Sequence, residues 1–297
     1  MADLKNQHFL QKAYLDGFAA TDVPDHWRKT TAIWVLNKDT GVISLHSTQN
    51  TAARSYYYSF MDRTGAMNPT IEKWFNPVEN QFVRIRQHIR DHIEEVNLTG
   101  QASNLDPKYK RSLAEYVYIH IIRVPKIFDD IRRQAETYER ETAQKHGVQP
   151  DPNMAKVLAL RTMIRIGQSP GMNIVDSLMS RCLDVEFYPR TKVSLPTSDT
   201  PVMMYDETRG AGLAYGSTTV FFPLESSIML RFAEFGDNAK LVKQRYVGMA
   251  RPLPQLVGAH AQKEIYCRDP HVLEEVATFL GLKTTLRDPR PPKLQTS

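Results

Sequence analysis

Four polar residues stand in segments whose apolar sequence predicts burial: His8, Glu79, Arg123 and Asp199. A buried charge is costly unless it is paired or bound to a ligand. One imidazole, one guanidinium and two carboxylates are the groups that a hydrolase of an anionic substrate needs. We therefore expect Glu79 and Asp199 to bind a divalent cation, Mg²⁺ or Mn²⁺. Arg123 would then hold a phosphate group and His8 would act as general acid or base, so the predicted reaction is phosphodiester hydrolysis.

The same four residues also have a purely structural interpretation. An internal network of Arg123 with carboxylates would pin the helices to a sheet, and Asp199 before Thr200-Pro201 is typical of a tight turn. In that case the chain is a non-catalytic binding module, such as a toxin-like or defence-associated effector. The two interpretations differ in whether the polar cluster is open to solvent or enclosed.

A basic helix offers a second kind of site. Arg84, Arg86 and Arg90 fall on one predicted helix of a chain with net charge +5 and pI near 9.1. Such a helix predicts contact with nucleic acid if the three side chains share a face, and a solvated helix face if they do not.

Arg86 and His92 also match the Arg-x(4–6)-His spacing of helical ribonucleases that serve as toxins, as do Arg140 and His146. With the arginines and histidines present, about two such matches are expected by chance. The spacing therefore keeps a helical ribonuclease as an alternative without favouring it.

Several familiar sites are missing from the sequence. It has no P-loop, no GxSxG elbow and no HExxH motif, and the glycine-rich run 209–216 has the wrong spacing for a dinucleotide fingerprint. Cys182 and Cys267 stand alone, so neither a disulfide framework nor a zinc finger is indicated.

The elements that position the candidate residues follow from hydrophobic periodicity. Residues 33–45 predict a hairpin around the turn sequence Asn37 to Gly41. An amphipathic helix follows from Pro69 with a break or bend at Pro77, and a largely apolar helix runs from 106 towards Gly147. Pro125 predicts a kink in that helix just after Arg123.

The second half changes to β-type sequence. Apolar segments at 185–188, 193–195, 202–205, 220–222 and 228–230 predict strands of one antiparallel sheet. A helix around 253–262, a strand at 264–266 and a helix at 269–280 follow. We expect one α+β domain over 1–285, helical over about 69–183 and β-rich over about 184–285, and a flexible tail at 286–297.

Composition is that of an ordinary globular protein, with 41% hydrophobic and 24% charged residues. The N-terminal residues lack the layout of a secretory signal, and no apolar run reaches the length of a membrane span. These features predict a cytoplasmic location and no membrane partner.

The chain resembles a widespread microbial domain-of-unknown-function family. Its hallmark is an N-terminal H-Y-V-P-Q-x-Y-L-x-x-F segment followed later by S-D-x-P. The segments that carry the resemblance, over about residues 6–268, are His8 to Phe18, Ile33 to Gly41, Ile71 to Glu79, Ile122 to Pro125, Ser198 to Val202 and Phe222 to Leu224. Leu10-Gln11-Lys12 replaces Val-Pro-Gln of the hallmark. The resemblance implies an architecture and candidate residues, but no reaction.

Overall fold

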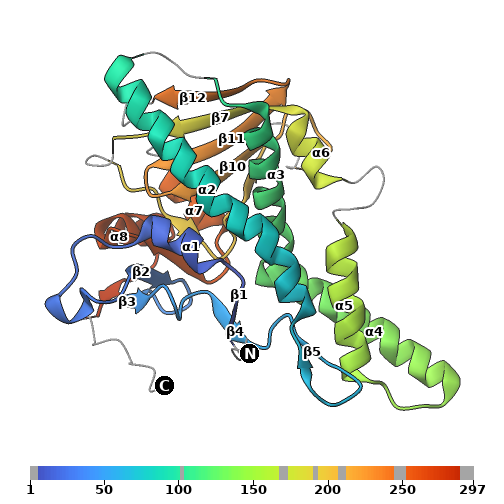
Figure 1. The fold of residues 1–297 in the computed structure, drawn as a ribbon. Helices are drawn as coiled ribbons and strands as arrows, with labels where there is room; N and C mark the ends of the chain where they lie inside the picture. The colour runs from blue at the N-terminus through green and yellow to red at the C-terminus, as the bar shows by residue number, and fades with distance from the viewer. Residues whose placement is uncertain are drawn as a thin grey trace.

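The computed structural model describes residues 6–100, 104–166, 173–189, 193–206, 212–243 and 252–287 (Figure 1). Within these ranges the chain forms two five-stranded sheets that are connected by a layer of helices. The α+β class expected from the sequence is confirmed, with the long helical middle, a β-rich second half and an N-terminal hairpin.

The hairpin consists of β2 (Ala32–Asn37) and β3 (Val42–Ser47), as predicted. Gly41 closes its turn with φ of 67° and donates its amide to Asn37 O at 2.8 Å. This left-handed conformation favours glycine, because a β-carbon on Gly41 would also lie 2.1 Å from Lys283 O. The hairpin is preceded by β1 (Asn6–His8), α1 (Lys12–Leu15) and short 3₁₀ turns at Asp16–Phe18 and Asp25–Trp27.

The hairpin belongs to a sheet of its own, which we call the hairpin sheet. Its strand order is β14 (Thr285–Leu286), β3, β2, β13 (Glu264–Cys267) and β8 (Thr197–Ser198). Trp34, Leu36 and Ile265 face α7 (Pro252–His260) and α8 (Pro270–Phe279), which cover one side. The alternate residues Ile33 and Val35 face the larger core on the other side, as a period of two requires.

The second sheet, which we call the central sheet, lies under the long helices. Its order is β12 (Ala239–Lys243), β7 (Arg181–Phe187), β11 (Ile228–Phe235), β10 (Thr219–Glu225) and β9 (Met203–Tyr205). The single antiparallel sheet expected for the second half is corrected here in two ways. β12 pairs parallel to β7, and residues 193–195 form no strand. β8 and β13 belong to the hairpin sheet, where β13 pairs with β2 and β8 pairs with β13. The alternation of apolar residues predicts a strand, but tertiary packing decides which strands are neighbours.

Five helices make up the middle of the chain: α2 (Thr70–Thr99), α3 (Pro107–Ile122), α4 (Pro125–His146), α5 (Pro152–Ile166) and α6 (Ile174–Met179). In Figure 1, α2 crosses the central sheet. Its apolar stripe, including Phe82 and Ile89, shares one core with Leu183 and Phe232 of that sheet. Pro77 lies inside α2 without ending it.

The kink predicted just after Arg123 is a complete break. α3 ends at Ile122, and Pro125 is the first residue of α4. Proline lacks the amide hydrogen that a continuous helix would need, but it is well accommodated at the first position of a new helix. α4 and α5 pack against each other as an arm that projects from the rest of the chain (Figure 1).

Short strands complete the region at the base of this arm: β4 (Ala53–Ser55) pairs with β1, and β5 (Phe60–Met61) pairs with β6 (Met67–Asn68). At the other end, β14 includes Leu286, and the Arg287 amide donates to Ile43 O at 2.9 Å, so regular structure continues past the expected boundary at 285. The rest of the expected tail, residues 288–297, lies outside the described residues, as do residues 207–211 of the glycine-rich region. Within the described ranges, no helix has both the length and the apolar character needed to cross a membrane.

Candidate functional site

Arg123, Glu72 and Glu79 form a buried ion-pair group, which we call the Arg123 cluster. The Arg123 guanidinium binds Glu72 Oε1 at 2.8 Å and also binds Glu79 Oε1, and the arginine side chain is 3% exposed. It lies over the Phe75 ring at 4.4 Å, and Tyr58 donates its hydroxyl hydrogen to Arg123 O. An internal Arg–carboxylate network, the structural alternative for these residues, is present: Arg123 binds Glu79 and also Glu72, two helical turns earlier on α2. It joins α2 to the connection between α3 and α4, and not to a sheet as that alternative expected.

The neighbouring carboxylates keep Arg123 ionised although it is buried. Burial disfavours the charge on Arg123, but Glu79 and Glu72 outweigh it and raise the arginine pKa. Burial raises the pKa of Glu72, and Arg123 opposes that change. One guanidinium is thus shared by two carboxylates inside the protein.

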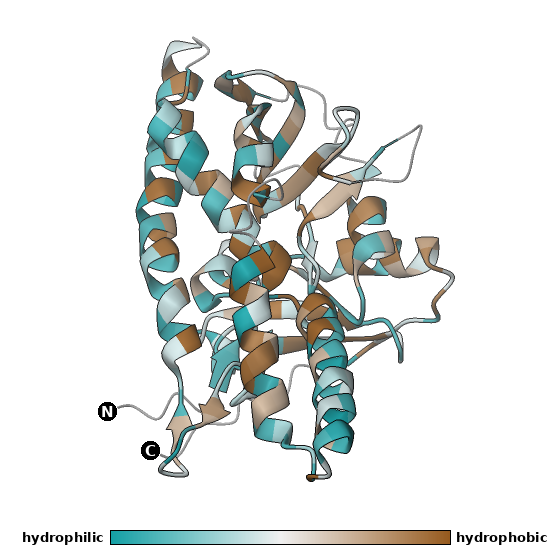
Figure 2. Cartoon of the chain, turned by 90° about the vertical axis from the view of Figure 1, so that its right-hand side faces the viewer, coloured by the Kyte–Doolittle hydropathy of each residue, from teal (hydrophilic) through white to brown (hydrophobic). Residues whose placement is uncertain are grey.

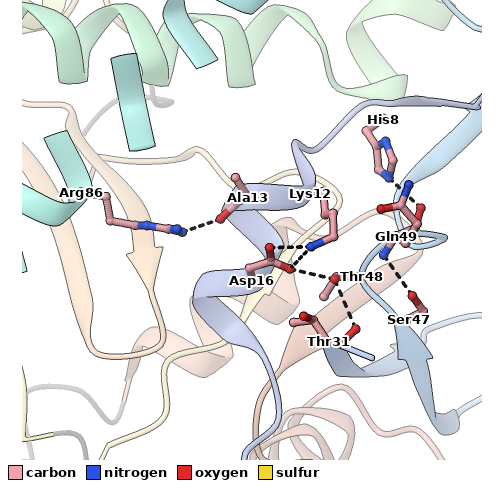
Figure 3. A network of polar contacts seen from close by, with 9 residues as sticks. All are labelled: His8, Lys12, Ala13, Asp16, Thr31, Ser47, Thr48, Gln49 and Arg86. Atoms are coloured by element: carbon pink, nitrogen blue, oxygen red, sulfur yellow. Dashed lines mark hydrogen bonds and ion pairs between the residues drawn. The ribbon is translucent and has the colours of Figure 1, made fainter. Parts of the chain in front are cut away.

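His8 lies beside this cluster without joining it. His8 Nε2 is 2.9 Å from Gln49 O, whereas Lys12, Asp16 and Thr48 form a neighbouring chain of contacts (Figure 3). Burial lowers the pKa of His8, and the bond to Gln49 opposes this effect. His8 is thus a neutral imidazole at pH 7 with a backbone partner.

Asp199 occupies a different place. Its carboxylate accepts backbone hydrogen bonds from Gln262 and Lys263, both at 2.8 Å, and from Glu264 at 3.3 Å. Burial nevertheless raises its pKa. These bonds hold the turn between α7 and β13. No contact in the described part of the chain joins the Asp199 carboxyl to that of Glu79, so the structure brings together Glu79 and Arg123, with His8 nearby, but does not join Asp199 to them.

The three arginines of α2 do not share one surface. Arg86 donates to Ala13 O (Figure 3). Its guanidinium also lies over the Phe82 ring at 5.3 Å. Arg90 Nε donates to the buried carboxylate of Glu225 at 2.9 Å, and Arg84 is exposed. Two of the three guanidinium groups are thus engaged within the protein.

The helical ribonuclease alternative pairs Arg86 with His92. The His92 ring lies 4.3 Å from the His88 ring, and its Nδ1 is 3.5 Å from Glu95 Oε2. The contacts described for His92 are therefore with its own helix, whereas those of Arg86 are with α1 and Phe82.

A cavity of about 850 Å³, which we call the cleft, lies between the hairpin sheet and the start of α4. Strand alternation places Asn37, His46 and Glu264 on the side of the sheet that carries Val35, and all four residues line the cleft. Residues 50–54 and residues from Pro125 to Arg133 form the facing walls. Asp199 also lines this cavity, so one residue of the predicted site opens onto a space large enough for a ligand.

The sheet side of the cleft carries an imidazole and two carboxylates. Tyr266 donates its hydroxyl hydrogen to Glu264 Oε2 at 2.7 Å, and Ser44 Oγ is 2.8 Å from His46 Nε2. Partial desolvation lowers the pKa of His46, while the nearby Glu264 opposes that shift. Glu264 also adds to the raised pKa of Asp199. His46 is thus a neutral base that lines the same cavity as Glu264 and Asp199.

The facing wall presents cations. Arg54 Nη1 lies 3.3 Å from Asp129 Oδ2 and stacks over the Tyr57 ring at 4.8 Å, and Tyr57 donates to Asp129 Oδ1 at 2.9 Å. Lys126 stands exposed at the start of α4. The side chains that the sequence prediction missed here are His46, Glu264 and Arg54. The signal for Glu264 was its place in the predicted strand 264–266, alternating with Tyr266. His46 lies one residue beyond the predicted hairpin, and its signal was the continued alternation after Ser44.

Together these features define a class of α+β protein in which a helical layer connects two sheets and one sheet carries a cleft of mixed charge. The chain belongs to the family described as "Protein of unknown function (DUF4238)", whose model matches residues 6–269. This match confirms the expected membership of a domain-of-unknown-function family. Neither the curated proteins nor the solved structures compared with the chain gave a match.

Proposed function

We propose that the cleft is a hydrolytic site for phosphate esters, with cleavage of phosphodiesters, including those of nucleic acid, as its reaction. The observation that supports this proposal is the meeting of His46, Asp199 and Glu264 on the sheet side with Arg54 and Lys126 on the facing wall of one cavity. The sequence analysis expected an imidazole, a guanidinium and two carboxylates in one site. The cleft contains these groups, but of the residues expected to supply them only Asp199 lines it. The distances and charges of the cleft suggest a role for each.

Arg54 and Lys126 suit the phosphate group. A guanidinium can offer two parallel hydrogen bonds to phosphate oxygens, and its stacking over Tyr57 holds its plane in place. An exposed lysine ammonium can approach the same group as a compact charge. The substrate's phosphate would compete with Asp129 for Arg54, which explains why that ion pair is exposed rather than enclosed.

His46 suits the attacking water. Its neutral imidazole can accept a proton from water as the water oxygen attacks phosphorus, and can return that proton to the leaving oxygen. The bond with Ser44 fixes the orientation of the ring. The buried Tyr266 holds the Glu264 carboxylate on the same side of the cavity.

A divalent cation is consistent with the charge of the cleft. Five acidic side chains line it against four basic ones, although the whole chain is basic: Asp39, Asp129, Asp130, Asp199 and Glu264 against Arg54, Lys126, Arg133 and Lys263. Mg²⁺ commonly takes one or two protein carboxylates and completes its shell with water and substrate phosphate oxygens. Among the described residues no group of three or more His, Cys, Asp or Glu side chains is placed to hold a metal by itself. Glu264 and Asp199 would hold a cation that arrives with the substrate and offsets its negative charge.

The test is hydrolysis of bis(p-nitrophenyl) phosphate and of labelled RNA and DNA by the full chain, with Mg²⁺, Mn²⁺ or EDTA. Glu264→Gln removes a cleft carboxylate, and Glu274→Gln makes the same change on α8, where that side chain is 41% exposed and pairs with His271. We expect Glu264→Gln to lower turnover about 100-fold or more, and Glu274→Gln to leave it unchanged. Equal turnover in the two variants, or no hydrolysis by the unmodified chain with any metal, would contradict the proposal.

A second candidate is a binding module that holds a phosphorylated ligand without cleaving it. The observation that favours it is that Arg54 and Arg133 already pair with Asp129 and Asp130 around the cleft. Thermal stabilisation by a nucleotide, lost in Arg54→Gln and unaccompanied by hydrolysis, would support this function over the first.

A further inference from the structure

The cleft continues along one face of α4. A second cavity of about 520 Å³ shares Asp130 and Arg133 with it and extends over Gln134, Thr137, Tyr138 and Glu141. These residues recur every three to four positions, so they form one side of a single helix. We call this surface the α4 trough.

The trough is open because α5 packs on the opposite side of α4. Ile131 and Ala143 are buried, whereas Arg133, Gln134, Thr137, Tyr138 and Glu141 are exposed. Hydrophilic residues cover most of this part of the arm in Figure 2. From Asp130 to Glu141 the helix rises about 16 Å. A substrate confined to the cleft would leave the trough empty.

Resting on the proposed function, we infer that the substrate is a single-stranded nucleic acid whose cleaved phosphodiester lies in the cleft and whose neighbouring nucleotides lie along the α4 trough. Tyr138 is the residue that points to this class. Tyr138 is 62% exposed, and an exposed aromatic ring can stack on any unpaired base. Gln134 can donate to base or sugar oxygens, and Arg133, which is 73% exposed, could exchange its partner Asp130 for a phosphate.

The trough is suited to stacking of a base on Tyr138 and not to electrostatic attraction of a polyanion. The trough offers one basic side chain, Arg133, and two acidic ones, Asp130 and Glu141. A polyanion without bases would gain little there, and the paired bases of a duplex present no free face to Tyr138. The trough therefore selects an unpaired strand.

The experiment measures binding of a fluorescent oligothymidylate of about eight nucleotides, a length within the usual range of single-strand sites, to the full chain in EDTA, so that no turnover is needed. Tyr138→Ala should weaken binding about 10-fold, and Tyr138→Phe, which keeps the ring, should bind as the unmodified chain does. Tyr205→Ala removes a similarly exposed ring from β9 and serves as the matched control with unchanged affinity.

Equal affinity of Tyr138→Ala and the unmodified chain would overturn the inference, as would tighter binding of a duplex of the same length. Competition by inorganic polyphosphate as strong as that by unlabelled oligothymidylate would also overturn it, because charge alone would then explain binding. Because binding is read without cleavage, a failure of the hydrolase proposal appears separately, as absence of bis(p-nitrophenyl) phosphate turnover.

Discussion

The Arg123 cluster and the cleft contain the same kinds of charged group but differ in what those groups contact. In the Arg123 cluster the guanidinium and both carboxylates are enclosed and bind one another. In the cleft, Arg54 is 41% exposed and its partner Asp129 is also reached by solvent. Burial determines whether such charges are held by their own ion pairs or can exchange a partner for a ligand. The enclosed group therefore acts on stability, and the open group is the one suited to binding.

The largest expected effect comes from Arg123→Met. This change leaves the carboxylates of Glu72 and Glu79 without their partner inside the protein, so we expect the free energy of unfolding to fall by about 3–5 kcal/mol. Arg54→Met breaks an exposed ion pair and should cost no more than about 1 kcal/mol. Urea denaturation of both variants measures the difference.

A follow-up variant separates loss of charge pairing from loss of packing. Replacing Glu72 and Glu79 by Gln in the Arg123→Met background removes the unpaired charges and should restore most of the lost stability. If Arg54→Met proves as destabilising as Arg123→Met, the distinction between the enclosed and open groups is wrong.

The next effect concerns two histidines, His120 in the core and His46 in the cleft. Burial among Tyr14, Tyr116 and Phe222 lowers the pKa of His120 to about 3, against an ordinary value of 6.5. As the pH falls, this histidine is protonated in the unfolded chain at a higher pH than in the folded protein. The free energy of unfolding therefore decreases as the pH drops below 6.5. For a single group this loss reaches about 2 kcal/mol at pH 5.

His120→Leu removes that loss, so the difference in unfolding free energy between pH 7 and pH 5 should shrink by about 2 kcal/mol. His46→Asn is the control, and it should change the difference less, because the His46 side chain is exposed in the cleft. Unfolding curves at the two pH values test this, and an unchanged pH dependence in His120→Leu would contradict it.

The smallest effect distinguishes two buried tyrosines. Tyr266→Phe and Tyr116→Phe each remove one hydroxyl, bonded to Glu264 and to Gln11 respectively, and each should lower the free energy of unfolding by about 1 kcal/mol. Only Tyr266→Phe should also lower phosphodiester turnover, because only Tyr266 holds a cleft carboxylate. A comparable loss of turnover in Tyr116→Phe would show that the effect follows stability and not the cleft.

Much of the fold could be predicted from the sequence, because each element depends on local pattern. The hairpin follows from alternation around Asn37 to Gly41, and α2 follows from its apolar stripe. An ion pair of Arg123 with a carboxylate could also be anticipated from the sequence, since a charge in apolar sequence requires a partner. In contrast, the break at Pro125 was expected only as a kink, because sequence does not show whether packing will hold the helix together across a proline.

The cleft could not be assembled in the same way. Glu264 lines the same cavity as His46 only because β13 pairs with β2, more than two hundred residues earlier in the chain. Alternation shows that both side chains leave a strand on a defined face, but it does not say which strands are neighbours. Asp199 was identified by its type and setting, and its actual neighbours, the amides of 262–264, depend on the same long-range pairing.

The short connection between α3 and α4 fixes the base of the arm formed by α4 and α5. Arg123 and Val124 are the only residues between the two helices, and Arg123 is held through its guanidinium by α2 and through its carbonyl by Tyr58. Swinging the arm away from the hairpin sheet would break these bonds inside the core. The α4 part of the cleft wall is therefore anchored in the core, whereas the adjoining segment 50–54 meets α4 through the part-exposed ion pair of Arg54 with Asp129.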